Sequence, residues 1–167
     1  MLDYIGMITS YHRWAQRKLW QCVLTVSDED FVRPVAYSLG SLHQQMVHMM
    51  WVEALWYARI HSLPRPSYTT DDVPTRDELR TTWDAIEAQW LTYLEALTPV
   101  ELSRMVTFMR GNGEQVTMPV WQILTHLVNH GTDHRGQVLR LIHDAKGQTF
   151  EQDMFFYLQE TNAQTAI

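Results

Sequence analysis

Apolar residues recur at spacings of three and four along four long stretches of the chain. In the first stretch, about residues 3–25, the apolar stripe consists of Tyr4, Ile8, Tyr11, Ala15, Leu19 and Cys22. This spacing is the period of an amphipathic helix. The other three stretches and a shorter candidate for a terminal helix cover about residues 41–61, 76–97, 119–144 and 152–160. Four long helices with short or medium connections predict an all-α fold, a four-helix bundle.

Capping signals mark where two of these helices begin. Ser41 with Gln44, and Thr75 with Glu78, both fit the capping box, in which each side chain satisfies the backbone amide of the other residue. The segment "SLPRPSYTTDDVPTRDE", residues 62–78, contains three prolines, which fix φ and remove an amide donor. A linker is therefore expected between the second and third helices.

The segment "RMVTFMRGNGEQVTMP" predicts a short β-hairpin before the last long helix. Two β-leaning runs flank Gly111, Asn112 and Gly113, which tolerate the positive φ angles of a tight turn. Thr98-Pro99 is interpreted as the end of the third helix, and Pro119 suits the first turn of the fourth.

Composition excludes several classes of protein. The 167 residues have the size of one domain, expected to span 1–167, and the net charge of −6 repels nucleic acid. The first ten residues lack a leader pattern, and the most apolar stretch is too short to span a bilayer, so a cytoplasmic protein with no membrane partner is expected. Cys22 is the single cysteine, which excludes an intrachain disulfide and a zinc site built on thiolates, and we expect it in the core.

Two histidines fall on the apolar stripe of the last long helix. His130 and His134 are four residues apart, which stacks their rings one helical turn from each other. A buried imidazole without a partner costs about 1–3 kcal/mol. One bound cation would satisfy both rings, so the pair is a candidate metal site.

A third ligand is expected from the helix over 41–61, where His43 and His48 compete. We favour His48 because His43 lies beside the helix cap. On the last helix, His126 with His130 has the same spacing as His130 with His134, and spacing alone does not choose between the pairs. Gly131 lowers helix stability by about 1 kcal/mol, which indicates a need for space near that residue and favours His130 and His134.

Other polar residues receive less specific interpretations. Glu53 and Asp133 are candidates for a base or an outer-shell partner, but each is offset from the nearest ligand face, so a surface ion pair is favoured for both. Gln137 and Arg135 are candidates to orient ligands or substrate, with packing or a dimer interface favoured for Arg135. The methionines of the second helix are expected in the core. The remaining histidines, expected in solvent, are His12, His61 and His143.

Three segments resemble the signature segments of the DinB-like (DinB/YfiT-like) metalloenzyme family. They are "SYHRWAQRKLW", "SLGSLHQQMVHMMWVEALWYAR" and "HLVNHGTDHRGQVLRLI", of which "NHGTDHRGQ" is the most specific. The resemblance implies an up-down-down-up four-helix bundle, commonly a homodimer, with a divalent metal held by His48, His130 and His134. His12 stands where the family often has asparagine.

Three neutral imidazoles leave a divalent ion with an open coordination position, as in catalytic sites. The expected function is therefore a metal-dependent enzyme acting on a small molecule. The resemblance implies thiol-dependent S-transferase chemistry for it, and hydrolytic chemistry is the next candidate. The partner would be a low-molecular-weight thiol or water. Zinc is the default ion, and nickel also suits imidazole ligands. The alternative is a non-catalytic, dimeric metal-binding helical protein with a structural, sensing or stress-response role.

Overall fold

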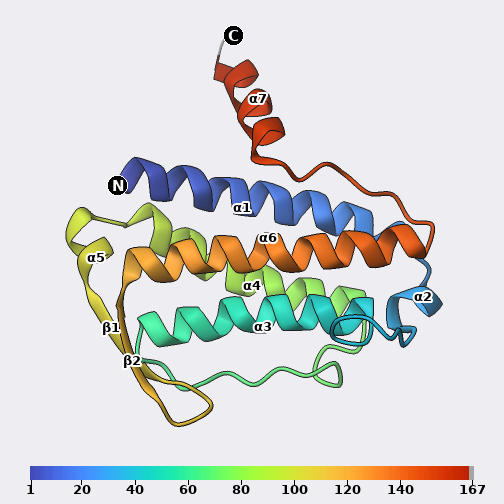
Figure 1. Cartoon of the computed structure of the whole chain (residues 1–167), viewed down its shortest axis with the longest axis horizontal. Coiled ribbons are helices and arrows are strands. Elements are labelled where there is room, and N and C mark those ends of the chain that lie inside the picture. Colours follow the sequence, from blue (N-terminus) through green and yellow to red (C-terminus); the bar gives the residue numbers. More distant parts are fainter. Residues whose placement is uncertain (166–167) are drawn as a thin grey trace.

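Four long helices lie side by side in the computed structural model (Figure 1). The structure describes residues 1–165, so residues 166 and 167 of the expected domain lie outside the described residues. The long helices are α1 (Leu2–Val23), α3 (Leu42–Ile60), α4 (Arg76–Glu95) and α6 (Val120–Asp144). In Figure 1, α1 and α6 run in one direction and α3 and α4 in the opposite one, which confirms the up-down-down-up bundle.

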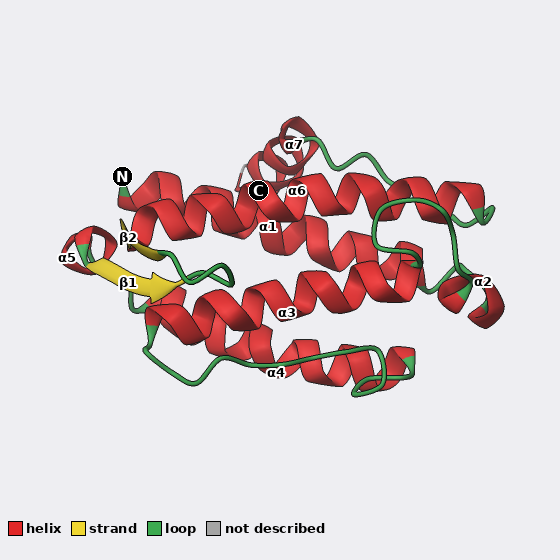
Figure 2. Cartoon of the chain, turned by 60° about the horizontal axis from the view of Figure 1, so that its bottom comes forward, coloured by secondary structure: helices red, strands yellow, loops and turns green. Residues whose placement is uncertain are grey.

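Helix α6 packs against both α1 and α3, and α3 packs against α4 (Figure 2). The apolar stripes predicted from the sequence meet in one core, where the methionines of α3 are buried as expected. Tyr4 is the exception, because its side chain is 53% exposed and lies outside the core. Cys22 is also buried, and this burial raises the pKa of its thiol. A raised pKa leaves the thiol protonated and unreactive, in agreement with a packing role.

The helix caps follow the sequence in part. Thr75 and Glu78 form both halves of the predicted capping box at the start of α4. At α3, the Ser41 hydroxyl accepts from the Gln44 amide at 3.1 Å, but no return bond from the Gln44 side chain forms. Pro119 is the N-cap of α6, so this helix begins one residue later than expected.

Two short helices were not predicted, α2 (Asp28–Val32) and α5 (Pro99–Ser103). Ser27 and Thr98 cap them by accepting from the backbone amide three residues on. Helix α4 ends at Glu95, shortly before Thr98-Pro99, as the stop signal predicts, and the same two residues also begin α5, with Thr98 as its N-cap and Pro99 in its first turn.

The predicted hairpin is present at one end of the bundle, as antiparallel strands β1 (Met105–Met109) and β2 (Gln115–Pro119). The turn uses one positive φ, at Gly113. Phe108 of β1 packs edge-on against Trp56 of α3, with ring centroids 5.1 Å apart. This contact gives the isolated strand pair the packing partner it needs.

The terminal helix α7 (Met154–Thr165) begins close to the expected position and extends past residue 160. It projects from the bundle beyond α1 (Figure 1). Tyr157 attaches its base to α1 through ring contacts with Tyr11 and Trp14, whose centroids lie 5.9 and 5.7 Å away. Within residues 1–165, no helix combines the length and the apolar character needed to cross a bilayer.

Candidate metal centre

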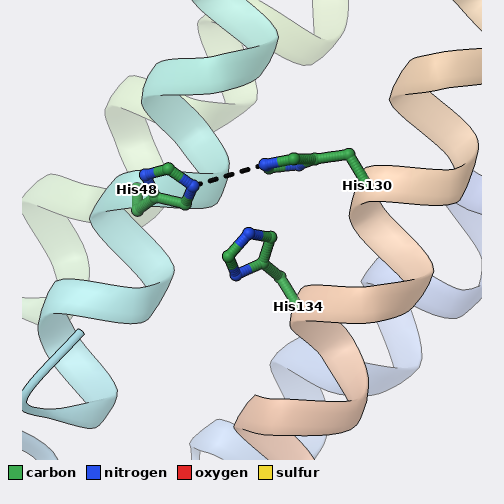
Figure 3. Close-up of side chains that lie close together, drawn as sticks. All are labelled: His48, His130 and His134. Carbon is green, nitrogen blue, oxygen red and sulfur yellow. Dashed lines mark hydrogen bonds between the residues drawn. The ribbon is translucent and has the colours of Figure 1, made fainter. Parts of the chain in front are cut away.

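Three histidine rings from two helices point into the same space (Figure 3). His48 extends from α3, and His130 and His134 extend from consecutive turns of α6. Each ring offers one nitrogen such that these three atoms all lie within 4.8 Å of one another. The structure therefore brings together the three residues selected from the sequence.

The two competing histidines lie elsewhere. His43 is buried, contacts the backbone carbonyl of Val73 through Nε2 at 2.8 Å and stacks on Phe31. His126 is exposed and packs edge-on against Trp56, with its ring centroid 5.8 Å from that of His130. The corresponding distance from His130 to His134 is 4.3 Å. Neither competitor belongs to the group of converging nitrogens.

Two nitrogens of the cluster have the spacing of two metal ligands. Nε2 of His48 lies 3.3 Å from Nε2 of His130. A tetrahedral zinc ion with Zn–N bonds of 2.0–2.1 Å places two ligand nitrogens about 3.3–3.4 Å apart. Imidazole is also a preferred donor for zinc and nickel. The residues present therefore fit a divalent ion.

A buried glutamine fixes the orientation of one ring. Nδ1 of His134 lies 3.0 Å from Oε1 of Gln45, which is fully buried on α3. The Gln45 amide nitrogen donates to Oε1 of Gln137 at 2.9 Å and to the Ser38 hydroxyl, so its oxygen faces His134. His134 must then carry its hydrogen on Nδ1, which leaves the lone pair of Nε2 free for an ion.

The same network reaches further along α6. Ser38 donates to Oε1 of Gln137, and the Gln137 amide nitrogen donates to Asp133 at 3.1 Å. Gln137 thus acts on the cluster through Gln45. Sequence reasoning missed Gln45 and Ser38. The available signal was the position of Gln45 one turn before His48 on the same helix.

Burial keeps the three imidazoles neutral. Desolvation lowers the pKa of His48 and of His134, although the nearby Asp133 carboxylate partly raises the latter. For His130, desolvation and then the neighbouring His134 and His48 lower the pKa to about 3. Neutral imidazoles are the form that binds a metal, so the environment prepares all three rings for coordination.

A second polar cluster lies beside this centre and corrects two expectations. Glu53 is 8% exposed and accepts from Trp83 Nε1 at 2.7 Å, so a surface ion pair for Glu53 was wrong. Nε2 of His12 contacts Glu53 at 3.1 Å, and the side chain of His12 is only 13% exposed. His12 is therefore a bridge between α1 and α3, not the solvated residue expected.

Arg135 completes this second cluster from α6. Its guanidinium is fully buried and donates to Nδ1 of His12 at 3.0 Å, to Thr132 and to Gln152. The favoured packing interpretation of Arg135 agrees with this burial, whereas a side chain with no exposed surface does not reach a partner chain. Both nitrogens of His12 are occupied, so its role is to connect three helices.

Gly131 serves the second cluster and not the metal centre. A Cβ at this position would lie 2.3 Å from Cε1 of His12 and 2.8 Å from Nη1 of Arg135. The expected close approach is present, but the inference that it makes room beside the His130 and His134 rings was wrong, because residue 131 faces α1.

The remaining candidates lie at the surface. His61 and His143 are exposed, as expected. Asp133 is exposed too, but it accepts a hydrogen bond from Gln137, and it has no ion pair within the described part of the chain.

Comparison with known proteins gives a family and a fold. The sequence profile of the DinB family matches residues 1–164. A DinB-like protein of Bacillus cereus of known crystal structure has 19% sequence identity and a TM-score of 0.61, covering 87% of this chain and 95% of that chain. A DinB-like protein of Bacillus subtilis has 12% identity and a TM-score of 0.62, covering 86% and 95%. No curated protein matches the sequence. Because the profile covers nearly the whole chain and both structures share its fold, the chain belongs to the DinB family.

Proposed function

We propose that His48, His130 and His134 bind one divalent ion and that the chain is a metal-dependent enzyme acting on a small molecule. The observation that carries this proposal is the convergence of three neutral imidazoles from α3 and α6. Zinc is the default ion, and nickel is the second candidate. With three protein ligands, an ion retains a position for a reactant.

The preferred reaction is thiol transfer. When bound, the ion lowers the pKa of a thiol or of water near it. The thiol sulfur then forms a bond to an electrophilic carbon, the leaving group departs with the electron pair of its broken bond, and the thiol proton is released. The hydrolytic version replaces the thiol by water. The role of the chain is to hold the three imidazoles neutral and, through Gln45, to keep Nε2 of His134 free.

Nearby acidic side chains have other partners, which supports an open position at the ion. Glu53 is engaged by His12 and Trp83, and Asp133 by Gln137. Within the described residues, the group of converging ligand atoms contains these three histidines and no carboxylate or thiol.

The test begins with elemental analysis of the protein purified without an affinity tag. The same protein is then assayed with a simple thiol and 1-chloro-2,4-dinitrobenzene, and with 4-nitrophenyl acetate and water. We expect about one equivalent of metal, and loss of both metal and activity in His130→Ala. His143→Ala is the matched control, because His143 lies on the same helix and is exposed. Full activity of His130→Ala despite metal loss contradicts the enzyme proposal.

The alternative is a homodimer in which the metal stabilises the bundle without catalysis. It is favoured by exposed aromatic residues on the projecting helix α7, where Phe155 and Phe156 are 57% and 37% exposed. If this function is correct, light scattering should give the mass of a dimer, and the metal-bound protein should show no activity in either assay. In His130→Ala, thermal stability would fall while the chemistry stays absent.

A further inference from the structure

A groove of about 270 Å³ lies beside the candidate metal centre, between α3 and the linker that follows it. We propose that this groove binds the body of the substrate, and that this body is an uncharged, planar ring. The inference rests on the proposed function, because it assigns the substrate class of the same site.

The groove adjoins the metal centre through a shared residue. Its floor is one face of α3, with residues at the helical spacings i, i+3, i+4 and i+7, namely Gln44, Val47, His48 and Trp51. Its wall is residues 68–70 of the linker. His48 lines the groove while its Nε2 faces His130. A molecule in the groove therefore has one end next to the cluster.

The linker wall is held on both sides of the groove. Trp51 Nε1 donates to the carbonyl of Pro66 at 3.1 Å, before residues 68–70. After them, the buried His43 contacts the carbonyl of Val73 at 2.8 Å. These two ties fix the wall before a ligand arrives, and a preformed site reduces the ordering cost of binding.

The lining chemistry selects an uncharged ligand. Apart from the imidazole of His48, none of the side chains that line the groove is acidic or basic. The nearby Asp72 carboxylate is engaged, accepting from both the amide and the hydroxyl of Thr69 at 2.7 Å. A charge on the ring body, away from the end that faces the metal centre, would lose hydration without gaining a charged partner from the lining, which is costly. The exposed Arg65 guanidinium lies 5.7 Å from the Trp51 ring centroid, but Arg65 is not one of the lining residues.

Two aromatic side chains select a planar ligand. Trp51 and Tyr68 both line the groove, on its floor and its wall respectively, and both are half-buried. Aromatic surfaces favour stacked or edge-on contacts with another ring. The amide of Gln44 and the hydroxyl of Thr70 supply neutral hydrogen-bonding groups beside them. An aromatic amide or ester has the shape and polarity that match this lining.

The test uses three small compounds of similar size: benzamide, benzoate and cyclohexanecarboxamide. Binding to the full-length protein is followed by NMR through the Trp51 indole N–H, assigned by its absence in Trp51→Phe. We expect benzamide to shift this signal. In protein freed of metal by a chelator, where no bound ion can attract a carboxylate, benzoate should bind at least about tenfold more weakly because it is charged, and cyclohexanecarboxamide because its ring is not planar. Benzoate binding to this metal-free protein as tightly as benzamide, which Arg65 would favour, overturns the proposal.

Substitutions at the wall provide the second arm. Tyr68→Leu removes the ring and should weaken benzamide about two- to twelvefold, whereas Tyr68→Phe should leave its affinity unchanged. Tyr4→Leu, on the exposed surface of α1, is the matched control. Equal affinity of Tyr68→Leu and the parent overturns the assignment of the wall.

The metal content of every sample separates the two proposals. Benzamide binding in protein without metal-binding capacity refutes the proposed function and leaves the groove assignment standing. Metal binding together with no benzamide signal, or with no ring preference, refutes the groove assignment alone.

Discussion

Oε1 of Gln45 lies 3.0 Å from Nδ1 of His134, and the amide nitrogen of the same glutamine is occupied by Gln137 and Ser38. The amide therefore faces the imidazole in one orientation. This single contact decides which nitrogen of His134 is available to an ion, because the other must donate its hydrogen to Gln45.

Replacing Gln45 by leucine should weaken metal binding about 10- to 100-fold, the usual effect of losing a hydrogen-bond partner of a ligand histidine. The measurement is a competition titration against a chromophoric chelator. Gln89→Leu, on the exposed face of α4, is the matched control. An unchanged metal affinity in a folded Gln45→Leu protein would show that the network does not orient His134.

Gly131→Ala should destabilise the apo-protein by about 1–3 kcal/mol, because the added Cβ would lie 2.3 Å from Cε1 of His12 and overpack the α1–α6 contact. Urea unfolding measures the effect. In His12→Ala the nearer obstacle is gone and only Nη1 of Arg135, at 2.8 Å, remains, so adding Gly131→Ala to that variant should cost less than in the parent.

Gly136→Ala on the same helix is the control for helix propensity. Its added Cβ meets only Gln152 Nε2, at an ordinary 3.7 Å. We expect no loss of stability, and a gain of up to about 1 kcal/mol. Equal costs at residues 131 and 136 would refute the close contact with His12.

Glu53→Ala should lower the free energy of unfolding by at least about 1–3 kcal/mol. The substitution leaves the buried Trp83 indole N–H and the His12 ring without their acceptor. Glu151→Ala, at an exposed position, serves as the control and should change stability by less than about 0.5 kcal/mol. Chemical denaturation monitored by tryptophan fluorescence measures the stability of both variants. Equal stabilities of Glu53→Ala and Glu151→Ala would mean that the cluster of His12, Glu53 and Arg135 does not stabilise the fold.

The apo-protein should lose stability as the pH falls below about 6.5. The pKa of His130 is about 3 in the folded chain, against 6.5 for an ordinary imidazole. Below pH 6.5 the unfolded chain binds more protons than the folded one, so the stabilisation present above that pH is lost progressively toward pH 3. Urea unfolding between pH 8 and 5 in the presence of a chelator measures the slope.

The variant His130→Asn removes the imidazole whose pKa is lowered, so its free energy of unfolding should depend less steeply on pH over this range. Asn129→Ala is the control, because residue 129 is exposed on the same helix and does not titrate, and it should keep the slope of the parent. Identical slopes in the parent and His130→Asn would contradict the lowered pKa of His130.

The long helices could be predicted because their signals are local: apolar spacing defines each stripe, and Thr75 with Glu78 defines a start. The hairpin followed from Gly111 to Gly113 for the same reason. Helices α2 and α5 span five residues each, too short for a periodic pattern, and their caps resemble ordinary turns. Physical cues that operate over three or four residues thus account for most of the fold.

The part of the candidate site that lies on α6 could be predicted from the sequence. His130 and His134 share a face by spacing alone, whereas His48 required knowledge of which helix packs beside α6. The second cluster was missed because its contacts are distant in sequence: His12 meets Glu53 across 41 residues and Arg135 across 123. A lone polar residue in the sequence carries no sign of such a partner, so Glu53 and His12 resembled surface residues.

The two helices that supply the histidines are far apart along the chain, since His48 and His130 are separated by 82 residues. An ion held between them would fasten a loop that contains the linker, α4, α5 and the hairpin. Like a disulfide, such a metal-closed loop would reduce the conformational entropy of the unfolded chain, but a chelator rather than a reductant would open it. Withdrawal of the ion would therefore loosen the contact between α3 and α6 first, while the linker stays tied to α3 through Trp51 and His43.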